Sequence, residues 1–117
     1  MNLIIAGSRD LDDLELVQRW TENVSRICAI NCVLCGGARG ADALGKQVAE
    51  AAGIAVKMFP AEWDKYGRGA GYRRNIDMAR EGTFLLAFPM PNSKGTLHII
   101  ETMQEMNKPV LIIGTGY

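Results

Sequence analysis

The sequence predicts one α/β domain over residues 1–117, with a Rossmann-like, three-layer αβα fold around a five-stranded, mainly parallel sheet of order 3-2-1-4-5. Short apolar segments alternate with segments of helical periodicity, which is typical of βαβ units. The apolar segments are uninterrupted, which indicates strands buried on both faces. The chain of 117 residues, 48% of them hydrophobic, is long enough to bury a single core.

The first half of the chain supplies three strands and two helices. Residues 3–6 are an apolar run, and apolar side chains then recur at helical spacing over residues 14–27. A second apolar run, residues 32–35, precedes a helix over residues 41–52. Residues 54–59 are the third expected strand.

The second half begins with the longest irregular stretch, residues 60–71, which leads into a short helix over residues 72–79. We expect a functional or mobile loop at 60–71, because loops of that length are uncommon in compact domains. Residues 83–88 form the fourth expected strand. The last helix spans residues 96–106, and the last strand spans residues 110–113.

Polar or glycine-rich segments follow the expected strands. Right-handed crossovers place every strand-to-helix loop at the same edge of a parallel sheet. This geometry gathers residues 7–9, 36–42, 60–71 and 89–96 around one crevice. In open α/β sheets, ligands bind at this edge.

The second strand runs into Gly36-Gly37-Ala38-Arg39-Gly40. Such a turn leaves backbone N–H groups bare at a helix N-terminus, which suits a phosphate, although a plain tight turn is the alternative. Arg39, like Arg9 after the first strand, precedes a helix, where a cation is unfavourable unless an anion lies nearby. Asp42 either caps the second helix or holds ribose hydroxyls.

Two adjacent arginines, Arg73 and Arg74, open the third helix. They favour a bound anion at this helix start as well, and a solvated basic turn is the alternative. Trp63, Tyr66 and Tyr72 lie nearby in the sequence. Their rings either stack on a base or anchor the loop to the core.

The segment after the fourth strand also offers hydrogen-bond donors. Ser93, Gly95 and Thr96 present backbone N–H groups and hydroxyls to a second phosphate or a ribose. His98 is the only histidine, and it is either a general acid or base or a structural residue.

These arguments define a nucleotide-type site that requires no separate cofactor. The expected ligand-binding residues are Gly7, Ser8, Arg9, Gly36, Gly37, Ala38, Arg39, Gly40, Asp42, Trp63, Arg73, Arg74, Asn75, Pro89, Ser93, Gly95 and Thr96. If the site is catalytic, the candidate acid or base residues are His98, Glu62 and Asp42.

Composition argues against other classes of protein. Thirteen basic residues balance 13 acidic ones, so net charge indicates neither a nucleic-acid nor a membrane surface. The N-terminus has no signal-peptide pattern, and three cysteines suit reduced thiols, so we expect a cytoplasmic protein. Cys28, Cys32 and Cys35 have iron–sulfur spacing, but Cys32 and Cys35 bracket a strand and point to opposite faces, so we expect no metal site.

In combination, the motifs at residues 5–9, 36–42, 59–67, 74–75 and 95–98 resemble the SLOG superfamily, most closely its YspA/YpsA-related (cpYpsA-related) group of small bacterial and phage proteins. The resemblance spans nearly the whole chain. It implies a Rossmann-like fold that recognises nucleotides or ligands of the ADP-ribose and NAD type, and it is compatible with a homodimer.

Two other branches of the superfamily show a more distant resemblance. The LOG-type phosphoribohydrolases carry Pro-Gly-Gly-x-Gly-Thr-x-x-Glu, which Pro91, Gly95 and Thr96 match, together with an upstream arginine that Arg74 matches. Ile99 stands at the position of the catalytic glutamate, and glycoside cleavage needs a carboxylate. DprA-type binders of single-stranded DNA share the Arg-Asn pair, but the neutral, aromatic-poor chain argues against DNA.

The sequence thus leads to a nucleotide-binding domain that serves as a sensor, a sequestering protein or an accessory module. The alternative is a hydrolase of nucleotide N-glycosidic bonds that uses a non-standard acid or base. In such an enzyme, Glu81 is a further carboxylate that would have to substitute for the missing catalytic glutamate.

Overall fold

The computed structural model describes residues 1–115 and contains the predicted parallel sheet. The strand order is β3-β2-β1-β4-β5, and every neighbouring pair is parallel. The strands are β1 (Asn2–Gly7), β2 (Cys32–Cys35), β3 (Ala55–Met58), β4 (Phe84–Phe88) and β5 (Val110–Ile112). The predicted fold class and strand order are confirmed.

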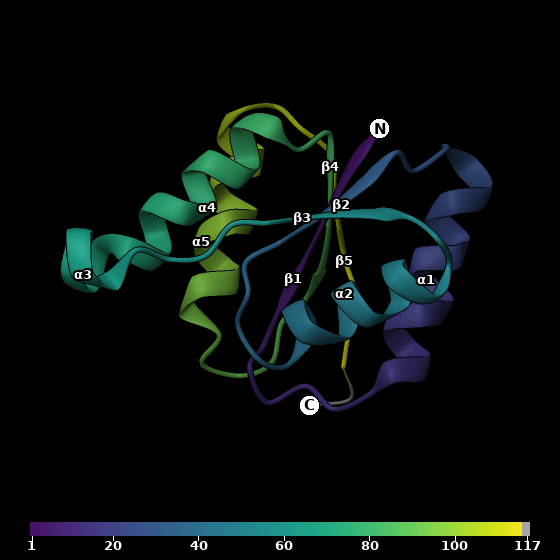
Figure 1. Cartoon of the computed structure of the whole chain (residues 1–117), viewed down its shortest axis with the longest axis horizontal. Coiled ribbons are helices and arrows are strands. Elements are labelled where there is room, and N and C mark those ends of the chain that lie inside the picture. Colours follow the sequence, from purple (N-terminus) through teal and green to yellow (C-terminus); the bar gives the residue numbers. More distant parts are fainter. Residues whose placement is uncertain (116–117) are drawn as a thin grey trace.

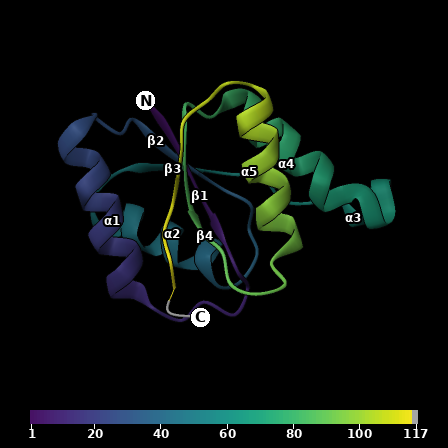
Figure 2. The same ribbon diagram turned by 180° about the vertical axis from the view of Figure 1, so that it is seen from behind.

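Helices cover both faces of this sheet (Figures 1 and 2). One face carries α1 (Leu14–Ile27) and α2 (Ala41–Ala51), which pack against each other, and the other carries α4 (Ala70–Glu81) and α5 (Lys94–Glu105). The short helices α3 (Trp63–Tyr66) and η1 (Gly67–Gly69) lead into α4. No helix within residues 1–115 is long and apolar enough to cross a bilayer.

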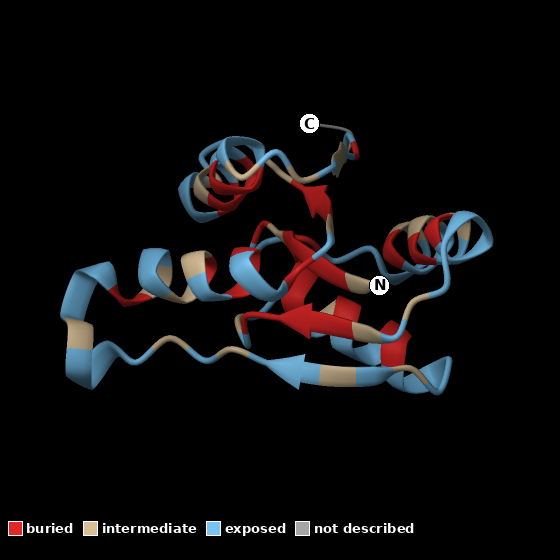
Figure 3. Cartoon of the chain, turned by 90° about the horizontal axis from the view of Figure 1, so that it is seen from above, coloured by how far each residue is buried: buried red, intermediate tan, exposed pale blue. Residues whose placement is uncertain are grey.

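The alternation of side chains along β1 divides the core in two. Leu3 and Ile5 pack with α1 and α2, whereas Ile4 and Ala6 pack with α4 and α5. Both sets are buried, because β1 is the central strand and is covered on both faces (Figure 3).

The edge strand β3 differs from the prediction. It spans four residues rather than residues 54–59, and Ala55, Lys57 and Met58 are exposed. Ile54 instead donates its N–H to the carbonyl of Ala49 at the end of α2. An apolar run at a sheet edge therefore does not guarantee burial on both faces, and Figure 3 shows β3 largely in the colour of exposed residues.

The predicted irregular loop at residues 60–71 is also wrong, because most of it is helical. Glycine suggested a loop, but of Gly67, Gly69 and Gly71 only Gly67 has a positive φ, +59°. Gly69 has helical dihedral angles, and Gly71 lies inside α4, where a Cβ would be in ordinary contact with Trp63 at 3.5 Å. The helical segment projects beyond the sheet at the N-terminal end of α4 (Figure 1).

The cysteines lie as the strand geometry predicts. Cys35 belongs to the core under α1 and α2, Cys32 packs on the opposite face, and Cys28 is exposed. Within residues 1–115, no three histidine, cysteine or acidic side chains are grouped closely enough to hold a metal ion.

Candidate functional site

A crevice with two lobes lies at the carboxyl edge of the sheet. The large lobe, about 540 Å³, lies among the β1–α1 and β4–α5 loops and α4, where the chain order reverses between β1 and β4. The small lobe, about 500 Å³, lies between the β2–α2 turn and the segment after β3. Arg9, Ala38, Trp63 and Arg74 line both lobes and form the waist between them.

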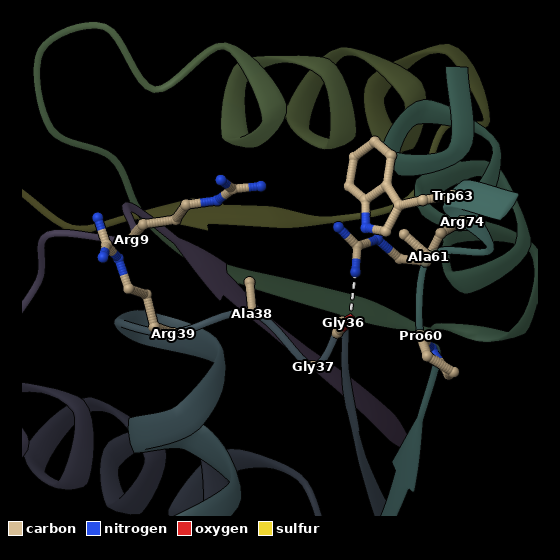
Figure 4. A pocket seen from close by; sticks show the side chains of 9 residues that line it. All are labelled: Arg9, Gly36, Gly37, Ala38, Arg39, Pro60, Ala61, Trp63 and Arg74. Carbon is tan, nitrogen blue, oxygen red and sulfur yellow. Dashed lines mark hydrogen bonds between the residues drawn. The ribbon is translucent and has the colours of Figure 1, made fainter. Parts of the chain in front are cut away.

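The small lobe is strongly basic. Its lining contains Arg9, Arg39 and Arg74 and no acidic residue. In Figure 4, Arg9 and Arg39 lie on one side of the opening, Trp63 and Arg74 lie on the other, and Ala38 lies between them. Three guanidinium groups around one hollow favour an anionic ligand.

The large lobe combines charged and hydrogen-bonding groups. Arg68 and Lys94 add positive charge to Arg9 and Arg74, while Asp10 and Asp42 supply carboxyl groups. The remaining lining residues are Ala6, Gly7, Ser8, Ala38, Trp63, Gly71, Tyr72, Asn75, Met78, Pro91, Asn92, Ser93, Gly95, Thr96 and Ile99.

Arg74 is held at the waist by the protein itself. Its Nη1 donates to the carbonyls of Gly36 and, at 3.3 Å, Phe59, and its Nε donates to Asn75 Oδ1 at 3.0 Å. Burial lowers the pKa of the guanidinium, and the nearby Asp42 carboxyl opposes that shift. Nη2 makes no hydrogen bond within residues 1–115, so one edge of the guanidinium is available to a ligand.

Asp42 lies in the first turn of α2 and braces the glycine-rich turn before it. Its Oδ2 accepts the N–H of Ala38 at 3.2 Å, so the carboxyl group ties the turn to the helix. Burial raises the pKa of Asp42 to about 6, against the opposing effects of the Ala38 hydrogen bond and Arg74. A Cβ on Gly36 would come within 2.8 Å of Oδ2, so this approach requires glycine.

Gly40 brings the β1 and β2 loops together. Its φ is +76°, and a Cβ there would lie 2.6 Å from Arg9 Cα. Next to it, Ala41 donates its N–H to the carbonyl of Ser8 at 3.1 Å. Gly40 does not itself line either lobe, but it places Arg9 and Arg39 at the same opening.

The N-terminus of α5 faces the large lobe without a side-chain cap. Ser93 precedes the helix, but its Oγ accepts the N–H of Met90 at 3.0 Å instead of a helix N–H. Lys94 occupies the first helical position, where no acidic residue offsets it. Thr96 is 6% exposed, and its hydroxyl has no hydrogen-bond partner among the described residues.

Several predicted site residues lie elsewhere. Arg73 does not line the crevice, because its guanidinium stacks on the Tyr66 ring at 4.2 Å. Pro89 lies outside both linings, and its carbonyl accepts the Thr115 hydroxyl.

Of the three candidate acid or base residues, only Asp42 lines the crevice. Glu62 is exposed outside both linings. His98 is also outside; its ring stacks on Tyr72 at 4.4 Å, and its Nδ1 lies 3.2 Å from Asn75 Nδ2. Glu81, the further carboxylate, is paired with Lys57 at 2.8 Å.

The prediction missed two cations, Arg68 and Lys94. Lys94 carried a signal, because it lies just before the predicted helix over residues 96–106, where a cation is unfavourable without an anion, as argued for Arg39. The structure begins this helix two residues earlier, at Lys94 itself. Arg68 carried no such signal, because the glycines within residues 60–71 predict an irregular loop and not the start of a helix. Ile99, 1% exposed, lines the large lobe at the position where LOG-type enzymes carry glutamate.

Comparison with known proteins agrees with this architecture. Residues 1–66 match the model of the YspA, cpYpsA-related SLOG family, which is more than half of the chain. The chain belongs to this SLOG family. It is 38% identical over 88 residues to the Gene 61 protein of Mycobacterium phage D29, and the match covers 70% of each chain. No solved structure matches the chain significantly.

The part that matches the SLOG family model runs from β1 to the end of α3. It therefore includes Arg9, the glycine-rich turn and Trp63, which line the small lobe and the waist. Membership of the SLOG family points to a ligand related to nucleotides.

Proposed function

We propose that this SLOG-family protein binds a nucleotide, or an ADP-ribose or NAD-derived ligand, in the two-lobed crevice and acts as a sensor, sequestering protein or accessory domain. The observation that carries the proposal is the basic waist and small lobe, where three arginines meet the exposed ring of Trp63. Phosphates pair with guanidinium groups, and a base stacks on an aromatic ring.

Thermal unfolding with AMP, ADP-ribose or NAD at millimolar concentration tests this proposal. At least one of them is expected to raise the midpoint, because a ligand that binds only the native state stabilises it. Arg74→Ala should remove the effect, and Arg80→Ala, an exposed arginine on the same helix, should retain it. No rise with any of the three compounds would refute the proposal.

A second candidate function is hydrolysis of a nucleotide N-glycosidic bond. Asp42 favours it, because a buried carboxyl group whose pKa is raised to about 6 can hold a proton near neutral pH. The apolar Ile99 in the large lobe argues for binding alone. The protein is incubated with AMP or NAD, and the mixture is analysed by chromatography for free base. Base release that both Asp42→Asn and Arg74→Ala abolish would establish the hydrolase.

The cellular location and the oligomeric state are part of the same proposal. We expect a cytoplasmic protein, because Cys28 is an exposed free thiol and no disulfide forms within residues 1–115. The family resemblance is compatible with a homodimer, and analytical ultracentrifugation measures the oligomeric state.

A further inference from the structure

We infer that the ligand carries two separate phosphate groups, one in each lobe, joined through a hydroxylated sugar at the waist. A nucleoside 3′,5′-bisphosphate has this chemistry. The inference rests on the proposed nucleotide binding and specifies which class of nucleotide the crevice selects.

The small lobe supplies the first anion site. Arg39 lines only the small lobe, and its one ion pair within residues 1–115, with Asp10 at 3.7 Å, joins side chains that are 78% and 76% exposed. An ion pair so exposed contributes little, so a phosphate can replace Asp10 as the partner of Arg39. No acidic side chain lines the lobe to compete with it.

The large lobe supplies the second anion site at the start of α5. The N–H groups of this helix have no side-chain cap, and Lys94 adds a full positive charge to its first turn. Thr96 is 6% exposed and lines this lobe, and its hydroxyl has no hydrogen-bond partner among residues 1–115. No fully buried polar side-chain atom of the described residues lacks a partner, so the Thr96 hydroxyl is open to the crevice, where it can donate to a phosphate oxygen.

The waist suits a sugar better than a phosphate. The Asp42 carboxyl group lies beside Arg74, offsets its charge and, when ionised, repels a phosphate. Carboxylate oxygens accept hydrogen bonds from hydroxyl groups. Trp63 borders both lobes and is 51% exposed, so its ring is free to contact a base attached to that sugar.

Calorimetric titration with adenosine 3′,5′-bisphosphate, ADP and AMP tests the inference. ADP is the matched control, because its two phosphates are adjacent rather than separated. We expect the 3′,5′-bisphosphate to bind at least about tenfold more tightly than ADP and AMP, the effect of one additional charge-assisted contact.

Arg39→Gln and Lys94→Gln each address one lobe at an exposed position. Each should reduce bisphosphate affinity about tenfold, and one of them should leave AMP affinity unchanged, because AMP fills only one anion site. Lys46→Gln is the matched control, an exposed lysine that pairs with Glu50 outside the crevice.

The outcomes separate the two proposals. If ADP binds as tightly as the bisphosphate, the two-site inference is wrong, while nucleotide binding stands. If both variants weaken AMP and bisphosphate equally, there is a single anion site and the inference is again wrong. If none of the three nucleotides binds but ADP-ribose or NAD raises the unfolding midpoint, the two-site inference is wrong and the proposed function stands; if ADP-ribose and NAD fail as well, the proposed function itself fails.

Discussion

Asn75 holds the side chain of its neighbour Arg74 in place. Its Oδ1 accepts the Arg74 Nε hydrogen at 3.0 Å, while its Nδ2 donates to the Gly95 carbonyl at 3.0 Å. The same Nδ2 lies 3.2 Å from His98 Nδ1. A single buried amide thus links the arginine of the waist to the start of α5, on the other side of the large lobe.

Replacement of this amide should affect both stability and binding. Asn75→Ala leaves Arg74 Nε without a partner and removes the tie to the Gly95 carbonyl at the start of α5, so the free energy of unfolding should fall by about 1–3 kcal/mol. Affinity for AMP should fall as well, because Arg74 loses its orientation. Urea unfolding and calorimetry measure the two effects, with Gln47→Ala on the exposed face of α2 as the control. An unchanged unfolding midpoint would contradict the role assigned to Asn75.

The raised pKa of Asp42 predicts how stability depends on pH. In the unfolded chain this carboxyl group ionises near pH 4, whereas in the native protein it ionises at about 6. Between these values the native state binds more protons, so this group lowers stability as pH rises from 4 to 6 and has a constant effect above that.

Asp42→Asn removes this contribution. Relative to the natural protein, the variant should gain about 2–3 kcal/mol in free energy of unfolding between pH 4 and pH 7. Urea titrations at several pH values provide the comparison, and Asp64→Asn, which is exposed on α3, is the control. A difference between variant and natural protein that stays constant with pH would show that the Asp42 pKa is not raised.

The central strands of the sheet are predictable from the sequence because each is marked by a local run of apolar residues. The runs at β1 and β4 are apolar throughout, and only a central parallel strand buries such a run on both faces. At β3 the run of residues 54–59 lies at the sheet edge and contains Lys57, a charged side chain typical of edge strands, whereas the sequence prediction treated this run like the central ones. The sequence does not predict the helical residues 63–69, because glycine is a poor helix former and Gly67, Gly69 and Gly71 follow one another at short intervals.

The candidate site was predictable to the extent that it depends on backbone position. Right-handed crossovers alone bring Arg9, the glycine-rich turn and Thr96 to one edge. Side-chain direction was not predictable: Arg73 and Arg74 are adjacent in a helix, so they point about 100° apart, and only Arg74 faces the crevice. Asp42 is identified as a brace of the glycine-rich turn only from the structure, in which its Oδ2 accepts the N–H of Ala38.

Gly36 is expected to tolerate no side chain. A Cβ would lie 2.7 Å from Arg74 Cζ and 2.8 Å from Asp42 Oδ2, so Gly36→Ala must displace Arg74 in the waist and Asp42 beside it. Nucleotide affinity should therefore fall at least about tenfold, since charge-assisted contacts depend on position. Gly69→Ala is the control, because a Cβ there meets nothing within 4 Å and φ is negative. Equal affinities for the two variants would contradict the close packing at Gly36.

Lys108 is expected to stabilise the fold without contributing to binding. Its Nζ donates to the carbonyls of Ala79, Arg80 and Gly82 at 2.7, 3.0 and 2.8 Å, and so satisfies the C-terminal end of α4. Lys108→Met keeps much of the aliphatic stem and removes the donor, which should lower the free energy of unfolding by about 1–2 kcal/mol. Calorimetry with AMP below the unfolding transition should show unchanged affinity. A loss of affinity would mean that the end of α4 is coupled to the crevice at its start.

Tryptophan fluorescence offers a direct readout of the waist. The chain has two tryptophans, and Trp63 borders both lobes, whereas Trp20 packs against the core beneath α1. A base that stacks on Trp63 should change its emission, so AMP should alter the fluorescence of the natural protein and of Trp20→Phe to the same extent. Trp63→Phe should lose the change while it still binds AMP in calorimetry.

Trp63→Ala separates stacking from simple proximity. Removal of a stacked aromatic ring weakens nucleotide binding by about 1–3 kcal/mol, so affinity should fall by a factor of about five to more than a hundred. Ribose 5-phosphate, which has no base, should bind both proteins equally. If Trp63→Ala weakens ribose 5-phosphate as much as AMP, the indole shapes the small lobe and does not contact a base.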